Sequence, residues 1–238
     1  MKQERAVLLS KKILTENVYH LYFYTEGNGF EFVPGQYVVL NVPSSPSPLK
    51  RLYSFAGSNN DKKAFDLLIK LVPGGISSEY IRGLSIGDTI EVSGPAGLFS
   101  EQKTDNRKIY MATGTGFAPI RSFLLSHKSG SINSSLFWGL KDLSEIYLFE
   151  ELRALEQQNP LFSFSYCLSQ QSSFSSIPAD LLHYYRPGHL DRVWAEKMPI
   201  VDLKDEYYLC GSRTVIDSLR SLLLSKGVPK EKLFFEKY

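Results

Sequence analysis

IYMATGTGFAPIRSFLL, residues 109–125, predicts a strand, a glycine turn and a helix in direct succession. Residues 109–112 form an apolar run typical of a buried strand, and Gly114 and Gly116 permit a turn too tight for residues with a Cβ atom. Pro119 suits the first turn of a helix, because its fixed φ is helical and its missing N–H is not needed there. Such a turn gathers backbone N–H groups and the positive end of a helix dipole at one place, which suits a phosphate.

The turn lacks one glycine of the dinucleotide-binding pattern GxGxxG, because Ala118 and Pro119 stand at the third position. Taken alone, it is equally consistent with an ordinary strand-to-helix turn whose glycines serve only the bend. The choice between a phosphate site and a plain turn therefore depends on the segments on either side.

The residues before the turn are predicted to form short strands separated by Gly, Pro, Asn and Ser clusters. Period-two alternation is clearest in VYHLYFYT, residues 18–25. One short helix is expected in this half, near residues 77–84. The pattern favours a small antiparallel barrel. The predicted strands are 5–14, 18–25, 37–42, 64–72 and 89–93, and 43–50 is an exposed loop.

After a polar run at residues 100–108, which is the expected domain boundary, strand-like and helix-like segments alternate. This alternation indicates a parallel α/β sheet. A Ser/Gln-rich stretch at 169–176 is expected to be a loop. The predicted strands are 109–112, 136–139, 162–168, 207–210 and 232–237, and the predicted helices are 144–157 and 213–225.

Composition excludes several classes of protein. A formal net charge of +2 over 238 residues gives no concentrated basic character for nucleic-acid binding. The charged N-terminus resembles no secretory signal, and no apolar run is long enough to span a bilayer, so a cytoplasmic protein is expected. Cys167 and Cys210 are too few and too far apart for a disulfide framework, a zinc site or an iron–sulfur cluster, and the histidines lack metal-ligand spacing. No metal site is predicted.

Four further motifs are weak singly. RLYSFAGS at 51–58 joins a guanidinium, a ring and a hydroxyl on an expected strand, and GGISSEYI at 74–81 is a glycine turn entering a helix. GPAGLF at 94–99 is a turn, and YYLCGS at 207–212 repeats the strand-then-glycine pattern. Each has a structural interpretation: a packed strand, a helix N-cap, a chain reversal and a buried strand end. The chain closes with FFEKY, by itself a final strand.

In this order and spacing, these motifs resemble the ferredoxin-NADP reductase family of flavoenzymes over nearly the whole chain. The resemblance implies an FAD-binding domain at residues 1–101 and an NAD(P)-binding domain at 106–238. The expected fold is a six-stranded antiparallel Greek-key barrel followed by a five-stranded parallel α/β domain, with FAD and NADP or NAD as cofactors.

The resemblance also assigns roles in flavin binding. Arg51 is similar to the arginine that holds the flavin phosphates, which suits a planar fork of donors. Tyr53 is similar to the ring stacked on the isoalloxazine, and Ser54 to the hydroxyl near the flavin nitrogen that accepts hydride. The complete expected FAD set is Arg51, Leu52, Tyr53, Ser54, Gly75, Ile76, Ser77, Ser78 and Tyr238.

Nicotinamide binding and catalysis follow from the same resemblance. Cys210 is similar to the family cysteine beside the nicotinamide, with a buried inert cysteine as the alternative. Glu236 and Tyr238 match the C-terminal Glu-x-aromatic pattern, whose last ring covers the flavin. The catalytic set is Ser54, Cys210, Glu236 and Tyr238. The expected NAD(P) set is Thr113, Gly114, Thr115, Gly116, Pro119, Ser169, Gln170, Cys210 and Gly211.

The sequence departs from the plant-type pattern at two places. Gln170 stands where those enzymes carry an arginine for the 2′-phosphate, so the preference between NADPH and NADH stays open, with Arg186 or Arg192 as other sources of charge. The segment between Lys70 and Gly74 is short and lacks the tyrosine that covers the FAD adenine; FAD is still expected over FMN.

The implied function is hydride transfer between NAD(P)H and FAD, with single electrons exchanged with a separate ferredoxin or flavodoxin. Two alternatives stay open: an NADH-dependent reductase component of an oxygenase or cytochrome system, and a non-catalytic flavin-binding electron-transfer subunit. The carrier's identity, the direction of electron flow and the oligomeric state do not follow from the sequence.

Overall fold

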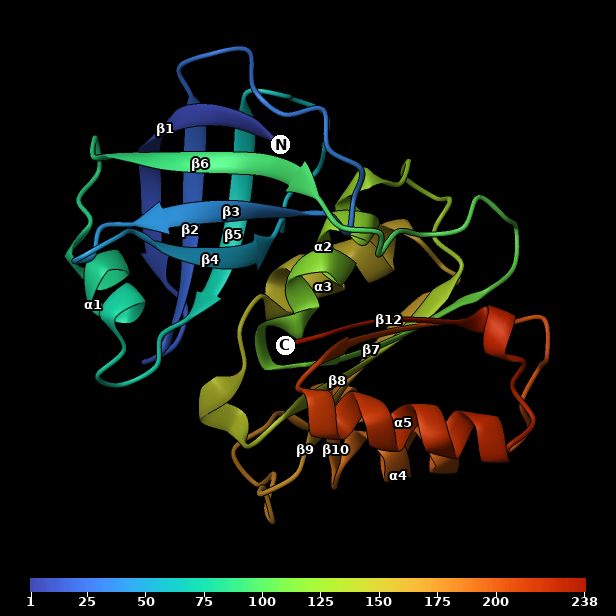
Figure 1. Ribbon diagram of the computed structural model, residues 1–238. Helices are drawn as coiled ribbons and strands as arrows, with labels where there is room; N and C mark the ends of the chain where they lie inside the picture. Colours follow the sequence, from blue (N-terminus) through green and yellow to red (C-terminus); the bar gives the residue numbers. More distant parts are fainter. The chain divides into compact units, whose positions relative to one another are not determined.

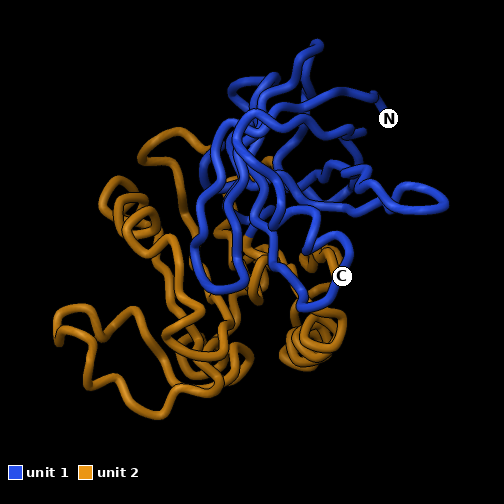
Figure 2. Tube along the Cα trace, turned by 90° about the vertical axis from the view of Figure 1, so that its left-hand side faces the viewer, with its two compact units in different colours: residues 1–101, 118–126 blue, residues 102–117, 127–238 orange.

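The computed structural model describes residues 1–238, and the chain divides into two compact units (Figure 2). Unit 1 contains residues 1–101 and 118–126, and unit 2 contains residues 102–117 and 127–238. Each unit has its own sheet and its own core. No helix of the chain is both long enough and apolar enough to cross a membrane.

Unit 1 contains a six-stranded antiparallel sheet with the strand order β4-β3-β6-β1-β2-β5 (Figure 1). A bridge between Phe55 and Leu67 joins the end of β4 to β5, so the sheet curls toward closure. This confirms the predicted antiparallel barrel. Its strands are β1 (Lys2–Ile13), β2 (Val18–Thr25), β3 (Tyr37–Val42), β4 (Leu49–Ser54), β5 (Ala64–Lys70) and β6 (Thr89–Ala96).

The barrel encloses an aromatic core. Phe32 and Phe55 stack with ring centroids 4.0 Å apart, and Phe65 meets Phe55 edge-on at 5.7 Å. Burial of each such ring contributes about 1.5–3 kcal/mol relative to leaving it exposed. The period-two pattern of residues 18–25 places Leu21 and Phe23 in this core, as β2 requires.

Two helices belong to unit 1: α1 (Ile76–Gly83) and, from residue 118 onward, α2 (Phe117–Ser126). The Lys11 ammonium donates to the carbonyls of Arg82 and Leu84 at 2.6 and 2.7 Å, which satisfies the C-terminal end of α1. In α2, the Arg121 guanidinium donates to the carbonyl of Ala56 at 2.8 Å. α1 is therefore held through its C-terminal carbonyls, which accept from Lys11 of β1, and α2 through its Arg121 side chain, which donates to a backbone carbonyl of unit 1.

Unit 2 is built on a parallel sheet with the strand order β10-β9-β8-β7-β11-β12. It has six strands where the sequence predicted five, because the three-residue β10 pairs with β9 at the edge. A strand of three residues that ends in proline carries no periodic signal. The strands are β7 (Lys108–Thr113), β8 (Ser134–Leu140), β9 (Phe162–Leu168), β10 (Tyr185–Pro187), β11 (Glu206–Gly211) and β12 (Leu233–Lys237).

Helices cover both faces of this sheet (Figure 1). The buried side chains of α4 (Leu190–Lys197) and α5 (Arg213–Ser225) share one core with Ile109, Met111 and Leu209. On the other face, Phe149 of α3 (Phe149–Gln158) packs edge-on against Phe164, with ring centroids 6.0 Å apart. Short 3₁₀ helices stand at η1 (Gly114–Gly116), η2 (Leu143–Glu145), η3 (Ala179–Tyr184) and η4 (Lys230–Lys232).

The prediction of a continuous helix over 144–157 is wrong at its start. Residues 143–145 form η2, which Asp142 begins by accepting a hydrogen bond from the Ser144 N–H at 2.8 Å, and α3 begins only at Phe149. Leu148 adopts a left-handed φ of 58°, which interrupts any helix that would join the two segments.

Candidate functional site

The N-terminus of α1 in unit 1 lacks a side-chain cap. Gly75 precedes the helix with extended backbone angles and, as a glycine, has no side chain to cap the first-turn N–H groups. The Ser77 hydroxyl is buried and has no hydrogen-bond partner, whereas the Ser78 hydroxyl accepts a bond from the Val72 N–H at 2.8 Å. Free helix N–H groups and an unpartnered buried hydroxyl together suit an anion such as a phosphate.

The residues between β5 and α1 leave room for such a group. Gly74 adopts a φ of 69°, and a Cβ atom there would meet nothing within 4 Å, so the space beside the turn is open. The Gly75 N–H donates to the Val72 carbonyl at 3.1 Å, which fixes the turn before the helix. The predicted residues Gly75, Ile76, Ser77 and Ser78 therefore share one helix terminus.

The RLYS motif occupies the edge strand β4. Arg51 and Tyr53 alternate with Leu52 and Ser54 along this strand, so each pair lies on one face. Arg51 is exposed, and its guanidinium donates a 3.1 Å hydrogen bond to the neighbouring Lys50 carbonyl. Tyr53 packs against the barrel core, and burial raises the pKa of its hydroxyl. The strand thus presents an uncommitted guanidinium and a fixed ring on the same face.

The glycine turn after β7 in unit 2 is the 3₁₀ segment η1. Gly114 has a φ of 52°, in the left-handed region that favours glycine. A Cβ atom on Gly116 would lie 2.3 Å from the Cys210 carbonyl oxygen, and one on Gly211 would lie 2.1 Å from the Thr113 hydroxyl. All three glycines are therefore required by backbone conformation or by close approach of β7 and β11.

The last residue of the chain reaches this turn. The Tyr238 hydroxyl donates to the Thr113 carbonyl at 3.0 Å and accepts from the Gly116 N–H at 3.1 Å. The Tyr238 N–H donates to the Gly211 carbonyl at 3.2 Å, yet the residue as a whole remains 65% exposed. The Tyr238 hydroxyl therefore holds the Gly116 N–H, a group that the sequence analysis assigned to dinucleotide binding, although Tyr238 as a residue is exposed.

Cys210 and Glu236 are paired in register on β11 and β12. Cys210 is almost fully buried, and burial, followed by the charge of Glu236, raises the pKa of its thiol well above the ordinary range. The group is consequently a neutral thiol at physiological pH. It can pack against a ligand or form a weak hydrogen bond, but it is not a thiolate nucleophile.

The predicted nucleotide residues at 169–170 follow β9. The Ser169 and Gln170 N–H groups donate to the Leu140 and Lys141 carbonyls at 3.1 and 2.8 Å, so this loop is joined to the end of β8. Of the two candidate arginines, Arg192 is paired with Glu196 at 2.8 Å. Arg186 on β10 has only a 3.4 Å bond to its neighbouring carbonyl, so it is the freer positive charge.

Pro119 follows the turn within α2. It is the third residue of that helix, in the first turn, where an N–H group would have no intrahelical acceptor, so the missing N–H of proline costs no hydrogen bond. It lies in the stretch 118–126, which belongs to unit 1, whereas Thr113, Gly114, Thr115 and Gly116 belong to unit 2.

Two residues at the turn were missed from the sequence. Trp138 on β8 and Tyr147 both donate to the Gly114 carbonyl, at 2.9 and 3.2 Å. Both are buried aromatic residues, and nothing in their local sequence distinguishes them from ordinary core residues. The pairing of β8 beside β7 brings Trp138 to the turn, and Tyr147 reaches it from the segment between η2 and α3.

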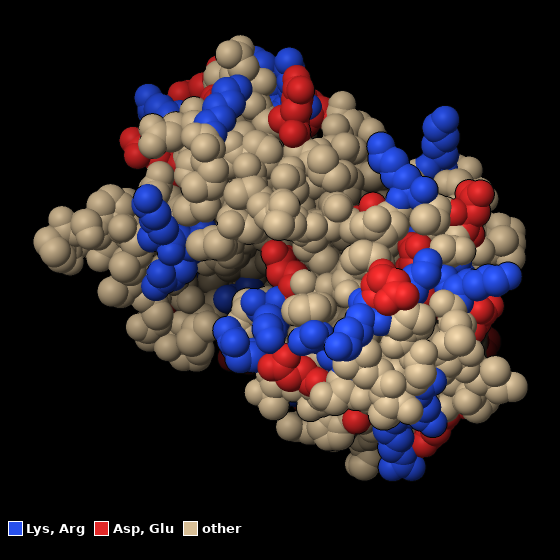
Figure 3. Space-filling view, turned by 45° about the vertical axis from the view of Figure 1, so that its right-hand side comes forward, with Lys and Arg blue, Asp and Glu red and all other residues tan.

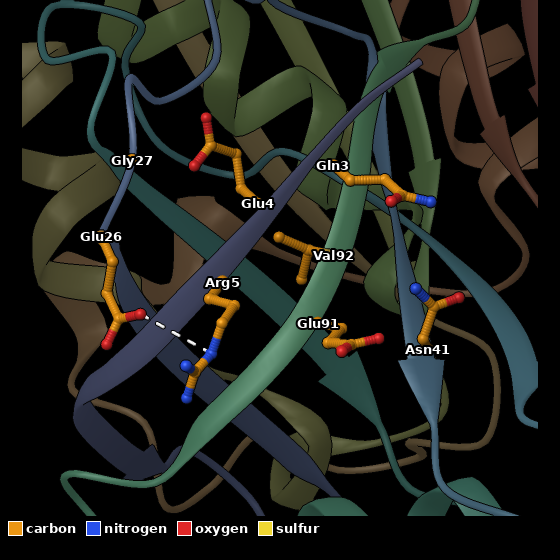
Figure 4. A pocket seen from close by; sticks show the side chains of 8 residues that line it. All are labelled: Gln3, Glu4, Arg5, Glu26, Gly27, Asn41, Glu91 and Val92. Atoms are coloured by element: carbon orange, nitrogen blue, oxygen red, sulfur yellow. Dashed lines mark ion pairs between the residues drawn. The ribbon is translucent and has the colours of Figure 1, made fainter.

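A separate pocket of about 450 Å³ lies on unit 1, among β1, β3, β6 and the segment after β2 (Figure 4). Its lining is mainly polar, and Arg5 pairs with Glu26 across it at 3.6 Å. None of the sequence-predicted site residues lines it. The lining residues are Gln3, Glu4, Arg5, Glu26, Gly27, Asn41, Glu91 and Val92.

Surface charge does not single out a macromolecular partner. On the face shown in Figure 3, Lys and Arg side chains are interspersed with Asp and Glu. This agrees with the formal net charge of only +2. No group of three or more His, Cys, Asp and Glu side chains is placed to hold a metal ion.

An antiparallel barrel with a phosphate-suited helix terminus, together with a parallel α/β unit with a glycine turn, is the fold of an enzyme class that the comparisons identify as oxidoreductases. Family models agree: residues 5–100 match an oxidoreductase FAD-binding domain, and residues 110–221 match an oxidoreductase NAD-binding domain. The chain belongs to the ferredoxin-NADP reductase-like family. The resemblance inferred from the motifs is thereby confirmed, as are the fold class and the FAD and NAD(P) cofactors.

Individual relatives are named as reductases. The chain is 29% identical over 219 residues to ferredoxin–NADP reductase B of Sorangium cellulosum, covering 90% of this chain and 88% of that protein. It is 28% identical over 214 residues to the electron transfer component of toluate 1,2-dioxygenase of Pseudomonas putida, covering 89% of this chain and 60% of that protein. The chain therefore spans less than two thirds of some of these relatives.

Solved structures show the same fold. A cytochrome P450 reductase of Amycolatopsis superposes with a TM-score of 0.87 at 24% identity, covering 99% of this chain and 69% of that one. A ferredoxin NADP+ reductase of Neisseria gonorrhoeae, solved with bound FAD and NADP, superposes with a TM-score of 0.82 at 16% identity. That match covers 100% of this chain and 99% of the Neisseria chain.

Proposed function

We propose that this protein is an NAD(P)H-dependent flavin reductase that passes electrons to a separate one-electron carrier. Residues 1–101 would form the FAD-binding domain and residues 106–238 the NAD(P)-binding domain. The observation that carries the proposal is the α1 terminus, where uncapped N–H groups and the unpartnered Ser77 hydroxyl suit a phosphate. FAD, when bound, accepts hydride from a nicotinamide and releases electrons singly.

In this proposal, the residues of the chain bind and orient the flavin and the nicotinamide. Arg51 supplies a fork of donors for phosphate oxygens, and Tyr53 supplies a fixed aromatic surface for the isoalloxazine ring. Ser54 is assigned a hydrogen bond near the reacting flavin nitrogen, and Cys210 and Glu236 are assigned to the nicotinamide. Because these groups position reactants, their contribution is one of orientation.

On the nucleotide side, the turn of Thr113, Gly114, Thr115 and Gly116 is assigned to NAD(P)H, with Ser169, Gln170 and Gly211 beside it. The Gly116 N–H is available to the nucleotide only after the Tyr238 hydroxyl has released it. Nucleotide binding therefore requires displacement of the terminal ring. Tyr238 as a whole residue is exposed and is not part of the hydrophobic core of unit 2, so the displacement does not disturb that core.

The first test is the colour and diaphorase activity of the purified chain. We expect a yellow protein that reduces ferricyanide with NADH or NADPH. A protein that stays colourless after incubation with FAD, and that reduces ferricyanide with neither nucleotide, would contradict the proposal. That outcome would support the alternative of a non-catalytic electron-transfer subunit.

The electron carrier is assigned by class. A ferredoxin or flavodoxin is expected, because the named relatives include a ferredoxin–NADP reductase and the electron transfer component of a dioxygenase. Stopped-flow reduction with NADH and NADPH in parallel distinguishes the two kinds of system. A strong preference for NADH would favour the oxygenase-reductase alternative, and a preference for NADPH would favour the ferredoxin-NADP reductase. The cytoplasmic location is likewise a prediction, which cell fractionation tests.

A further inference from the structure

The Gly114 carbonyl oxygen accepts three hydrogen bonds within unit 2. One comes from the Phe117 N–H within the turn itself, and two come from side chains: Trp138 Nε1 at 2.9 Å and the Tyr147 hydroxyl at 3.2 Å. A carbonyl oxygen has two lone pairs, so three donors saturate it. The direction of this carbonyl is therefore fixed from the buried side of the turn.

The two side-chain donors are themselves held in place. The Trp138 ring stacks on Phe117 with centroids 4.0 Å apart, and the Tyr147 ring meets Trp138 edge-on at 4.7 Å. The Tyr166 hydroxyl donates to the Tyr147 carbonyl at 3.1 Å, which anchors the Tyr147 backbone. Trp138 and Tyr147 are both buried, so neither can rotate away from Gly114 without disrupting this packing.

Fixing this carbonyl also fixes the next N–H group. In a planar trans peptide, the Gly114 carbonyl and the Thr115 N–H point in opposite directions. With the carbonyl held toward Trp138 and Tyr147, the Thr115 N–H must point away from the buried aromatic pair. The Gly116 N–H points to the Tyr238 hydroxyl. Both N–H groups are thus directed before any ligand arrives.

We infer that Trp138 and Tyr147 are positioning residues for nucleotide binding. By fixing the Gly114 carbonyl, they pre-organise the Thr115 N–H of the turn toward a phosphate oxygen of NAD(P)H, which lowers the ordering cost of binding. This inference rests on the proposed function, because it concerns the same turn. Neither residue needs to touch the nucleotide.

The test replaces Tyr147 by Phe, which removes the hydroxyl and keeps the ring. Tyr184→Phe is the matched control, because its hydroxyl is bonded to Glu156 at 2.5 Å and not to the turn. We expect Tyr147→Phe to weaken binding of NADP+ and NAD+ about fivefold by calorimetry, the loss typical of one hydrogen bond. Trp138→Phe should have a similar effect, and Tyr184→Phe should leave the Kd unchanged.

Amide hydrogen exchange provides a readout that does not depend on turnover. In Tyr147→Phe, the Thr115 and Gly116 amides should exchange faster, while β8 and β9 amides keep the wild-type rate. In steady-state kinetics, KM for the nucleotide should rise while kcat is retained. A purely structural role would speed exchange throughout unit 2 and lower kcat as well, which would overturn the inference.

The failures of the two hypotheses are distinguishable. If the wild-type chain binds neither NAD+ nor NADP+, the proposed function fails and the inference fails with it. If the wild-type chain binds nucleotide, and Tyr147→Phe and Trp138→Phe bind it equally well with unchanged exchange at the turn, only the inference is wrong.

Discussion

The first turn of α1 and the glycine turn after β7 both gather backbone N–H groups, but they differ in what those groups contact. At α1, no side chain caps the helix, and the buried Ser77 hydroxyl has no partner. At the glycine turn, the Gly116 N–H is already bonded to Tyr238. One site is left unsatisfied by the chain, and the other is satisfied by the chain's own last residue.

This difference indicates different kinds of ligand. A group that binds at α1 gains hydrogen bonds that the protein does not otherwise make, and leaving a buried polar group unpaired costs about 1–3 kcal/mol. A group that binds at the glycine turn must exchange with Tyr238, so its net gain is smaller. The first site suits a cofactor that stays bound, and the second suits a ligand that comes and goes.

The largest effect is expected from Arg51→Ala, which tests the proposed flavin-binding residues of unit 1. Removing the guanidinium should weaken FAD binding about 10- to 100-fold, the range for charge-assisted hydrogen bonds. The measurement is flavin bound per chain after gel filtration, from visible absorbance. Arg82→Ala is the control, since Arg82 is an exposed arginine of unit 1 whose recorded partner is Glu79 at 3.8 Å. Equal flavin content in the two variants would remove Arg51 from the site.

Two neighbouring serines of α1 provide a second test of FAD binding in unit 1. Ser77→Ala removes an unpartnered hydroxyl, so the FAD-free protein should keep its stability while FAD affinity falls about fivefold. Ser78→Ala removes the acceptor of the Val72 N–H, so the FAD-free protein should lose about 1 kcal/mol of stability. Thermal unfolding with and without FAD measures both. Loss of stability in FAD-free Ser77→Ala would show that its hydroxyl has a structural partner.

Tyr238→Phe tests the glycine turn, where the chain itself already satisfies the Gly116 N–H. The ring is kept and the hydroxyl that holds the Gly116 N–H is removed, so NAD(P)H should bind about threefold more tightly, a small effect because the ring is exposed. Titration with NADP+ and NAD+ measures it, and flavin content should not change. Tyr238→Ser, which also removes the ring, should alter nicotinamide affinity or the preference between nucleotides. Unchanged affinity in both variants would exclude displacement of the terminal ring.

A last effect, confined to alkaline pH, concerns a buried thiol of unit 2. Burial raises the pKa of Cys167 from 9.0 to about 12, so the folded protein keeps a neutral thiol where the unfolded chain would ionise. This contribution to stability is complete below pH 9.0 and is lost as pH rises toward 12. Denaturant unfolding across that interval should show a steeper loss for wild type than for Cys167→Ala. An equal loss would mean that the thiol is solvated.

The same burial predicts inert cysteines at neutral pH. Iodoacetamide should modify neither Cys167 nor Cys210 in the folded protein, and both after unfolding, as measured by intact mass. Rapid modification of Cys210 in the folded state would show a reactive thiolate beside the glycine turn. It would contradict the interpretation of this residue as a neutral packing group.

Secondary structure was predictable where a periodic pattern was long or well bounded. Residues 18–25, 37–42 and 213–225 form β2, β3 and α5 with the expected limits. The helix α4 and the strand β10 were missed, because eight- and three-residue elements give too few repeats to detect. The start of α3 was misplaced because the left-handed backbone at Leu148 has no signal in its side chain.

The sequence by itself determined the two kinds of unit, the glycine turn and the family, because periodicity and motif order are local properties of the chain. Only the tertiary structure decided that Tyr238, Trp138 and Tyr147 meet at residues 113–116. These partners are separated from the turn by 24 to 125 positions. Trp138 is carried by β8, which pairs with β7 in register, and Tyr147 and Tyr238 reach the turn from segments that follow η2 and β12. Hydrogen-bond direction at a turn depends on such distant neighbours, which no local pattern encodes.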